Sequence, residues 1–141
     1  MGSSDQSPPP GALAQSNPIP IAQLSPELDN IGERSVNAVV TLVWPFSSSS
    51  RCLSLLLAEP DFRLRRTNGQ VKVTFHGFCA EDVARTQVGI GDKVVLRLDG
   101  ARWADNEAAT ATPGRGIPWD LHFENRVALE VFTTIFAGIV R

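Results

Sequence analysis

The middle of the chain constrains its fold most strongly. Val71–Gly77 alternates apolar and polar side chains, and Gly89–Gly100 begins with two glycines, Asp92 and a second apolar run. Such alternation indicates strands with one buried face. The polar segment between them, with Glu81–Arg85 at its centre, has room for a short helix at most. A strand, a short helix and a strand in this order are typical of a small β-barrel.

Three further segments extend this pattern. Ser35–Trp44 is rich in β-branched residues and stops at Pro45, and Cys52–Ala58 is an apolar run before Pro60. Leu121–Val131 keeps a period of two, which only Asn125 breaks on its apolar side. We therefore predict an all-β fold, a five-stranded Greek-key barrel of the oligonucleotide-binding (OB) type with one short helix between strands three and four. OB barrels bind oligonucleotides or oligosaccharides on the face of strands two and three and through two neighbouring loops.

Composition divides the chain into three parts. Residues 1–33 are rich in Pro, Ser, Gln and Asn, which predicts a disordered or loosely docked segment with one short apolar stripe at Leu24, Leu28 and Ile31. Residues 34–131 form the predicted OB domain, and residues 132–141 form an apolar tail. Gly100–Ile117 reads as a polar loop that is too long to be a simple connection.

Asn68-Gly69 is the favoured dipeptide for a two-residue hairpin turn. With this turn, Arg65 faces Lys72 across two strands. Phe62, Leu64, Val71, Val73 and Phe75 then share the core face, and Arg63, Arg65, Lys72, Thr74 and His76 share the opposite face. Two cations directly opposite each other repel. The arrangement favours a bound anion over the alternative, in which the long side chains splay into water.

Charge is distributed unevenly along the chain. The net charge is only −2, but residues 34–103 hold ten Lys and Arg against six Asp and Glu. The remaining residues hold three basic and nine acidic side chains. A basic centre between acidic ends fits a localised site for a polyanion. Charge scattered over a small surface is the alternative.

No catalytic motif is present. The sequence has no phosphate-binding loop, nucleophile elbow or zinc-protease motif, and neither His76 nor His122 has partners at metal-ligand spacing. Cys52 and Cys79 lie in apolar sequence, which predicts reduced, buried thiols in an intracellular protein. The polar N-terminus does not look like a signal peptide, and the C-terminal apolar run is too short to span a bilayer. We expect no enzymatic activity, no cofactor, no metal, no small-molecule substrate and no membrane.

The tryptophans lie at the edges of predicted loops. Trp44 and Phe46 flank Pro45, Trp103 follows Arg102, and Trp119 follows Pro118 after Arg115. Single-stranded nucleic acid is bound by stacking bases on aromatic rings beside cations that contact phosphate. The alternative is that these rings close the ends of the barrel. For Trp44, contact with a ligand and closure of the barrel end are equally favoured. For Trp103 and Trp119, contact with a ligand is favoured.

Several segments together resemble the telomere end-binding OB domain of the protection-of-telomeres and yeast-type telomere-capping proteins. The segments are Val40–Phe46, Leu55–Phe62, Val71–Gly77, Gly91–Val94 and Gly116–Phe123. The resemblance implies a nuclear, chromosomal protein that binds the G-rich single-stranded telomere overhang without catalysis. By position, it assigns base stacking to Trp44 or Phe46 and to Trp119. It assigns strand contacts to Arg63, Arg65, Lys72 and His76, and contacts from the last loop to Arg102 and Arg115.

Two other functions remain open. One is an OB domain that joins proteins of a telomere complex without binding DNA, which the apolar Phe132, Ile135, Phe136 and Ile139 favour. The other is a general single-stranded nucleic-acid-binding module. The partners expected are therefore G-rich single-stranded DNA and other telomere-complex proteins.

Overall fold

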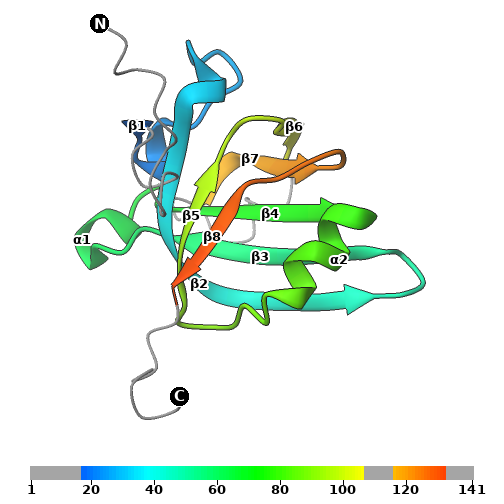
Figure 1. The fold of residues 1–141 in the computed structure, drawn as a ribbon. Helices are drawn as coiled ribbons and strands as arrows, with labels where there is room; N and C mark the ends of the chain where they lie inside the picture. Colours follow the sequence, from blue (N-terminus) through cyan, green and yellow to red (C-terminus); the bar gives the residue numbers. More distant parts are fainter. Residues whose placement is uncertain (1–16, 107–115, 133–141) are drawn as a thin grey trace, which may run out of the picture.

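A computed structural model of the chain describes residues 17–106 and 116–132, and these residues form a mostly β structure (Figure 1). The strands are β1 (Asn17–Pro18), β2 (Arg34–Ser47), β3 (Cys52–Ala58), β4 (Gln70–His76), β5 (Lys93–Arg97), β6 (Arg102–Asp105), β7 (Gly116–Phe123) and β8 (Leu129–Phe132). Two short α-helices, α1 (Phe62–Arg65) and α2 (Phe78–Arg85), and two 3-10 turns, Ile21–Gln23 and Ile31–Glu33, complete it. Within the described residues, no helix has the length and apolar character of a membrane span.

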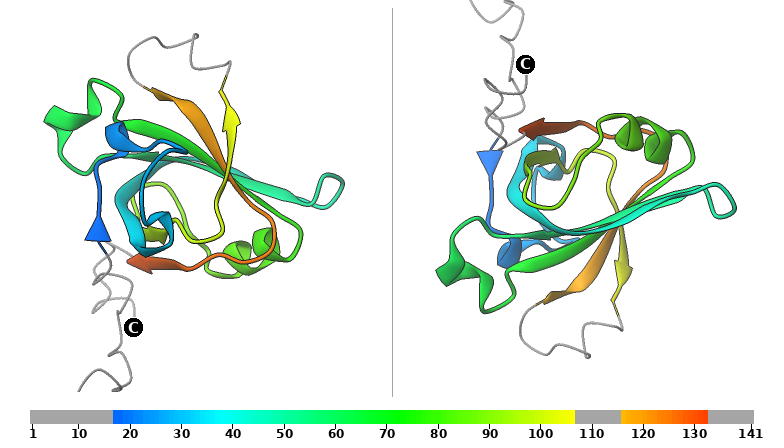
Figure 2. Two further views of the ribbon diagram at one scale, coloured as in Figure 1. Left: turned by 90° about the horizontal axis from the view of Figure 1, so that it is seen from above. Right: turned by 90° about the horizontal axis from the view of Figure 1, so that it is seen from below.

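The strands form one curled sheet with the order β6-β7-β4-β3-β2-β5-β8, and β1 pairs with β2 (Figure 2). The long β2 pairs with β5 through its first half and with β3 through its second. β7 lies parallel to β4, whereas β8 lies antiparallel to β5. The segment predicted as a single fifth strand is therefore two strands, separated by residues 124–128, and the hydrogen-bonded sheet is not closed.

The core lies inside this curl. Val71, Val73 and Phe75 of β4 are fully buried, as the alternation predicts, and Phe75 stacks on Phe123 of β7 with ring centroids 5.7 Å apart. Val94 and Leu96 of β5 and Leu98 just after it are buried as well. Because alternate residues of a strand point to opposite faces, burying this set fixes which side chains face outward.

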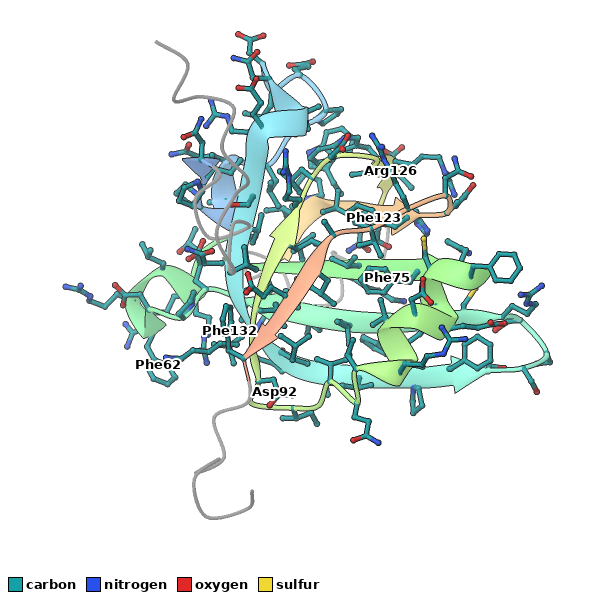
Figure 3. The ribbon with its side chains drawn as sticks, viewed as in Figure 1. Phe62, Phe75, Asp92, Phe123, Arg126 and Phe132 are labelled. Atoms are coloured by element: carbon teal, nitrogen blue, oxygen red, sulfur yellow. The ribbon has the colours of Figure 1, made fainter. Side chains whose placement is uncertain are left out.

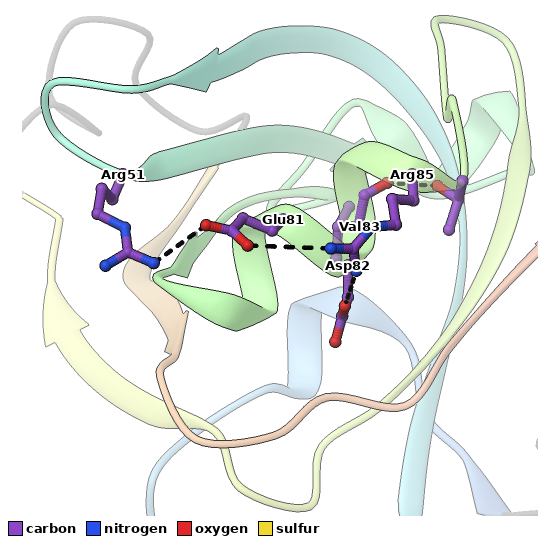
Figure 4. Close-up of polar contacts among 6 residues, drawn as sticks. Arg51, Glu81, Asp82, Val83 and Arg85 are labelled. Carbon is purple, nitrogen blue, oxygen red and sulfur yellow. Dashed lines mark hydrogen bonds and ion pairs between the residues drawn. The ribbon is translucent and has the colours of Figure 1, made fainter.

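The predicted short helix is present as α2. It buries Cys79, Ala80 and Val83 and lies between β4 and β5 in the chain. Arg51, in the turn between β2 and β3, donates to Glu81 at 3.0 Å, and Glu81 and Asp82 also pair with Arg85 (Figure 4). The Arg51–Glu81 pair joins the β2–β3 turn to α2, whereas the pairs of Arg85 lie within α2, and exposed ion pairs of this kind contribute little stability individually.

The predicted Asn-Gly hairpin is wrong. β3 and β4 pair directly, with Leu55 opposite Val73 and Leu56 opposite Lys72, and residues 59–69 connect them. Within this connection the Asp61 carboxylate accepts the Arg63 N–H at 2.9 Å and caps α1. Because Asp61 caps a helical turn just before Asn68-Gly69, this dipeptide does not form the predicted hairpin turn. Phe62 and Leu64, expected in the core, are 73% and 50% exposed, and Phe62 projects away from the body of the protein (Figure 3).

The N-terminal segment packs on the sheet. Ile19, Ile21 and Leu24 are buried, and Leu28 and Ile31 pack against the core. The nearly buried carboxylate of Glu59 accepts the Ile21 N–H at 2.6 Å. The core therefore begins before the domain boundary expected at residue 34.

The long polar loop contains a strand that was not predicted. β6 pairs antiparallel with β7, with Arg102 opposite His122 and Asp105 opposite Trp119. The middle of the expected loop, residues 107–115, and most of the apolar tail, residues 133–141, lie outside the described residues.

This fold predicts opposite results for two apolar side chains of the β3–β4 region. Leu55→Ala should lower the free energy of unfolding by about 2–5 kcal/mol, because Leu55 is fully buried. Phe62→Ala should change it by less than about 0.5 kcal/mol, because the ring is mostly in solvent. Urea denaturation followed by tryptophan fluorescence measures both. A large loss for Phe62→Ala would instead support the predicted hairpin.

Candidate nucleic-acid interface

One side of the sheet faces away from the core across β2, β3, β4, β7 and β6. We call it the sheet face. Its rows follow from the strand pairings: Leu42, Leu56, Lys72, Asp120 and Ala104 form one row, and Trp44, Ser54, Thr74, His122 and Arg102 form the next. Cys52 and His76 form a third row. The sheet face thus brings together four residues predicted for binding, Trp44, Lys72, His76 and Arg102.

Lys72 and Trp44 form a cation–aromatic pair at the centre of the sheet face. The Lys72 Nζ lies 4.8 Å from the centroid of the Trp44 ring, across β3. Trp44 is 43% exposed, and Leu42 beside it on the same strand face is also exposed. An ammonium group over an indole ring is attracted by the ring's electrons. The pair offers an accessible aromatic surface together with a positive charge.

A chain of three side chains crosses the sheet face next to this pair. The Cys52 Sγ lies 3.2 Å from His76 Nδ1, and His76 Nε2 lies 2.8 Å from His122 Nδ1. The two imidazole rings also stack, with centroids 5.1 Å apart. Cys52 is half-buried rather than buried, unlike Cys79, and both cysteines are free. The flat, stacked imidazoles add a second aromatic surface.

β6 and β7 form one edge of the sheet face, and the charged side chains on and next to these two strands set the pKa values there. Arg102 pairs with Glu124, its Nε donating at 3.0 Å. Burial lowers the pKa of His122, and the positive charges of Arg102 and His76 lower it further. The hydrogen bonds from Arg102 hold the pKa of the exposed Glu124 carboxyl below its usual range. His122 is therefore held neutral more strongly than an ordinary histidine, and it remains able to accept or donate one hydrogen bond.

Asp120 is the acidic member of the sheet face. It lies opposite Lys72 in the β4–β7 pairing, and its Oδ1 is buried without a hydrogen-bond partner among the described residues. Burial raises the pKa of the Asp120 carboxyl, and the positive charge of Lys72 opposes that rise. A buried carboxylate oxygen without a hydrogen-bond donor is costly, and the positive charge of Lys72 offsets part of that cost.

The remaining predicted residues lie elsewhere. Trp103 and Trp119 point to the core side of β6 and β7, where they pack edge to face with centroids 6.3 Å apart. Phe46 also packs against the core. Arg63 and Arg65 lie on α1, with Arg63 paired to Asp61 at 3.1 Å. Arg115 lies outside the described residues.

Leu42, Asp120, His122 and Glu124 were not among the residues predicted from the sequence to bind a nucleic acid. The alternation of Leu121–Val131 puts His122 and Glu124 on its polar side, but only the β4–β7 pairing shows that His122 meets His76. Within the described part of the chain, no three metal-ligating side chains converge on a common point. The chemistry of the sheet face is therefore that of aromatic stacking, cations and hydrogen bonds.

The chain belongs to a protein family whose description is "Domain of unknown function (DUF8502)", and the family profile matches residues 14–134. A comparison with curated proteins found no match. Among solved structures, Pot1pC of Schizosaccharomyces pombe bound to ssDNA (CGGTTACGGT) is similar, with a TM-score of 0.53 at 15% identity over 84% of this chain and 88% of that one.

Two further structures are similar to this chain. Fission yeast Pot1 with ssDNA has a TM-score of 0.54 at 13% identity, and the match covers 82% of this chain and 39% of that one. A protein described as an aspartyl-tRNA synthetase of Leishmania major has a TM-score of 0.55 at 14% identity, covering 84% of this chain and 21% of that one. At sequence identities this low, the similarity shows a shared fold alone.

His122 should make the stability of the fold depend on pH. Because its pKa is lowered in the folded protein, the unfolded chain binds the proton more readily. Stability should be fully present above the ordinary histidine pKa of about 6.5 and should fall, by at most about 1.4 kcal/mol per pH unit, as pH drops below it. His122→Asn should flatten this part of the profile. Asp120, whose pKa is raised, acts with the opposite sign at more acidic pH.

Urea denaturation of the wild type and His122→Asn at pH 7.5, 6.5 and 5.5 measures the effect. Equal pH dependence in the two proteins would contradict the lowered pKa of His122. A uniform loss of about 1 kcal/mol in the variant is expected at every pH from the lost His76–His122 hydrogen bond and does not bear on the slope.

Proposed function

We propose that this member of the DUF8502 family is a binding module for single-stranded nucleic acid, and that it binds on the sheet face. The observation that carries the proposal is the meeting of an exposed aromatic ring with a lysine, two stacked imidazoles and an arginine on one side of one sheet. Stacking contributes about 1–3 kcal/mol per base in such sites, and cations contact the phosphates. The proposed function is binding without catalysis.

The strand pairings support an OB-type barrel as the scaffold. In this interpretation β2, β3, β4 and β5 are the first four strands, α2 lies between the third and fourth, and β7 and β8 are two halves of the fifth. β7 beside β4 and β8 beside β5 are the pairings that bring such a barrel round on itself. The centre of the sheet face then lies on strands two and three, β3 and β4, where OB barrels bind oligonucleotides.

We further propose that the strand is G-rich telomeric DNA in the nucleus, with other telomere proteins as partners. The resemblance of Val40–Phe46 and Val71–Gly77 to protection-of-telomeres proteins supports this, as does the shared fold with Pot1pC.

A protein-docking role is the second candidate. Phe78 and Ile90 are large apolar side chains that are mostly exposed, and neither belongs to the sheet face. Arg51 lies 5.5 Å from the centroid of the Phe78 ring. A module that only joined proteins would use such side chains and would show no selective, salt-dependent binding to single strands.

The two lysines of the chain provide a matched test of the sheet face. Lys72→Ala should weaken binding to the decamer CGGTTACGGT and should reduce the slope of log K against log salt by about 0.7, the value for one phosphate contact on a single strand. Lys93→Ala removes the same charge from β5, outside the sheet face, and should change the slope little. Fluorescence anisotropy between about 50 and 200 mM salt measures both.

Equal slopes in Lys72→Ala and the wild type would remove Lys72 from the interface. Equal losses in the two variants would show that net charge alone, and not the sheet face, determines the affinity. Binding to duplex DNA as tight as to the single strand would also contradict the proposal, because stacking on Trp44 requires unpaired bases.

A further inference from the structure

The α1 turn contains a second aromatic and basic surface, which includes the predicted contact residue Arg65. Phe62 is mostly exposed, and the Arg65 guanidinium lies 4.3 Å from the centroid of its ring. These two residues, with Arg66 and Gln70, line a pocket of about 450 Å³. Pockets that hold small ligands have volumes of this order.

The pocket is held in place by contacts of the backbone. Arg65 Nε donates to the carbonyl of Glu59 at 2.7 Å, and the Asp61 side chain caps α1. A Cβ at Gly69 would lie 2.2 Å from the carbonyl oxygen of Leu64, so the α1 turn rests directly on the backbone that leads into β4. The exposed Phe62 ring therefore stands on a fixed turn and not on a free loop end.

The charges of this turn are not balanced within the described residues. Asp61 pairs with Arg63, and the Glu59 carboxylate accepts the Ile21 N–H. Arg65 and Arg66 form no ion pair with a described residue, and no acidic side chain is among the described residues that line the pocket. Two unpaired guanidinium groups beside an exposed ring favour an anion that also has a flat apolar part.

The pocket is continuous with the sheet face. Gln70, which lines it, is the first residue of β4, two residues before Lys72 and on the same side of the strand. Two residues of a strand advance about 7 Å. A ligand extended along β4 past Lys72 and Trp44 would therefore reach Gln70 and then Phe62.

We propose that this pocket binds one nucleotide at the end of the same single strand, with its base on the Phe62 ring and its phosphate at Arg66. The inference rests on the proposed function. A nucleotide matches both features of the pocket, because its flat base can stack on the ring and its phosphate can bind the guanidinium groups. An acidic segment of a partner protein would use the arginines as well but would not depend on the length of a nucleic-acid strand.

The test combines side-chain and ligand truncation. Fluorescein-labelled CGGTTACGGT and versions shortened by one or two nucleotides at either end are titrated into the wild type, Phe62→Ala and Arg66→Ala. The wild type should lose roughly 5- to 150-fold in affinity when the nucleotide at one particular end is removed, as expected for one stacked base. Each variant should bind the full decamer more weakly by a similar factor and should lose little more on that truncation.

Two variants serve as matched controls. Leu64→Ala removes an exposed apolar side chain of the same turn that does not line the pocket, and Arg85→Ala removes an exposed arginine of α2. Both should bind every strand like the wild type. Urea denaturation should show all four variants folded.

The possible failures are distinct. If Phe62→Ala and Arg66→Ala bind all lengths like the wild type while Lys72→Ala is weakened, the nucleotide pocket is wrong, the sheet face stands, and the pocket is left for an acidic protein segment. If both variants weaken every length equally, the pocket does not hold a terminal nucleotide. If the wild type binds none of the strands, the proposed function and this inference both fail.

Discussion

The alternation of side chains along β4 is the constraint on which the rest of the structure depends. Val71, Val73 and Phe75 are buried in the core, so Lys72, Thr74 and His76 must point outward. A shift of the strand by one residue would exchange the two sets and would bury a lysine and a histidine. Because β3 and β7 both pair with β4, this one strand also aligns the outward side chains of its neighbours. The candidate interface is thus a consequence of how the core is packed.

The polar groups between these outward side chains are largely satisfied by each other. The Ser54 and Thr74 hydroxyls lie 2.9 Å apart in a buried pair, and the His76–His122 contact joins β4 to β7. A hydrogen-bonded sheet surface of this kind presents its exposed rings and cations in fixed positions. Binding to such a surface costs less ordering than binding by loops that must fold around the ligand. Asp120 is the exception, because its buried Oδ1 has no partner among the described residues.

The strands and the core were predictable where the signal was long. β2, β4 and β5 appear where the sequence places them, because their apolar periodicity extends over five or more residues and is satisfied by the core. The hairpin predicted from Asn68-Gly69 is wrong because it depended on a pattern of only two residues. Asp61 caps a helical turn just before it, and the favoured hairpin would have placed Phe62 and Leu64 where Leu55 and its neighbours already fill the core.

The candidate site was predictable only in part, for a related reason. Lys72 and His76 could be placed on an outward face from β4 alone, but their partners come from strands distant in sequence. Trp44 meets Lys72 across β3, and His122 meets His76 through a parallel pairing that no local pattern specifies. Trp103 and Trp119 were expected at loop edges for the same reason. They lie instead on β6 and β7, a short pair of strands that packs both rings against the core.

The most direct test of the account is to find where a single strand contacts the protein. Titration of CGGTTACGGT into the ¹⁵N-labelled protein, followed by two-dimensional NMR, gives a shift for each backbone amide and for each tryptophan indole. Binding on the sheet face should shift the signals of Lys72, Thr74, His76, His122 and the Trp44 indole most and should leave Lys93 and Val95 unaffected. Changes centred on β5 and β8, or none at all, would contradict it.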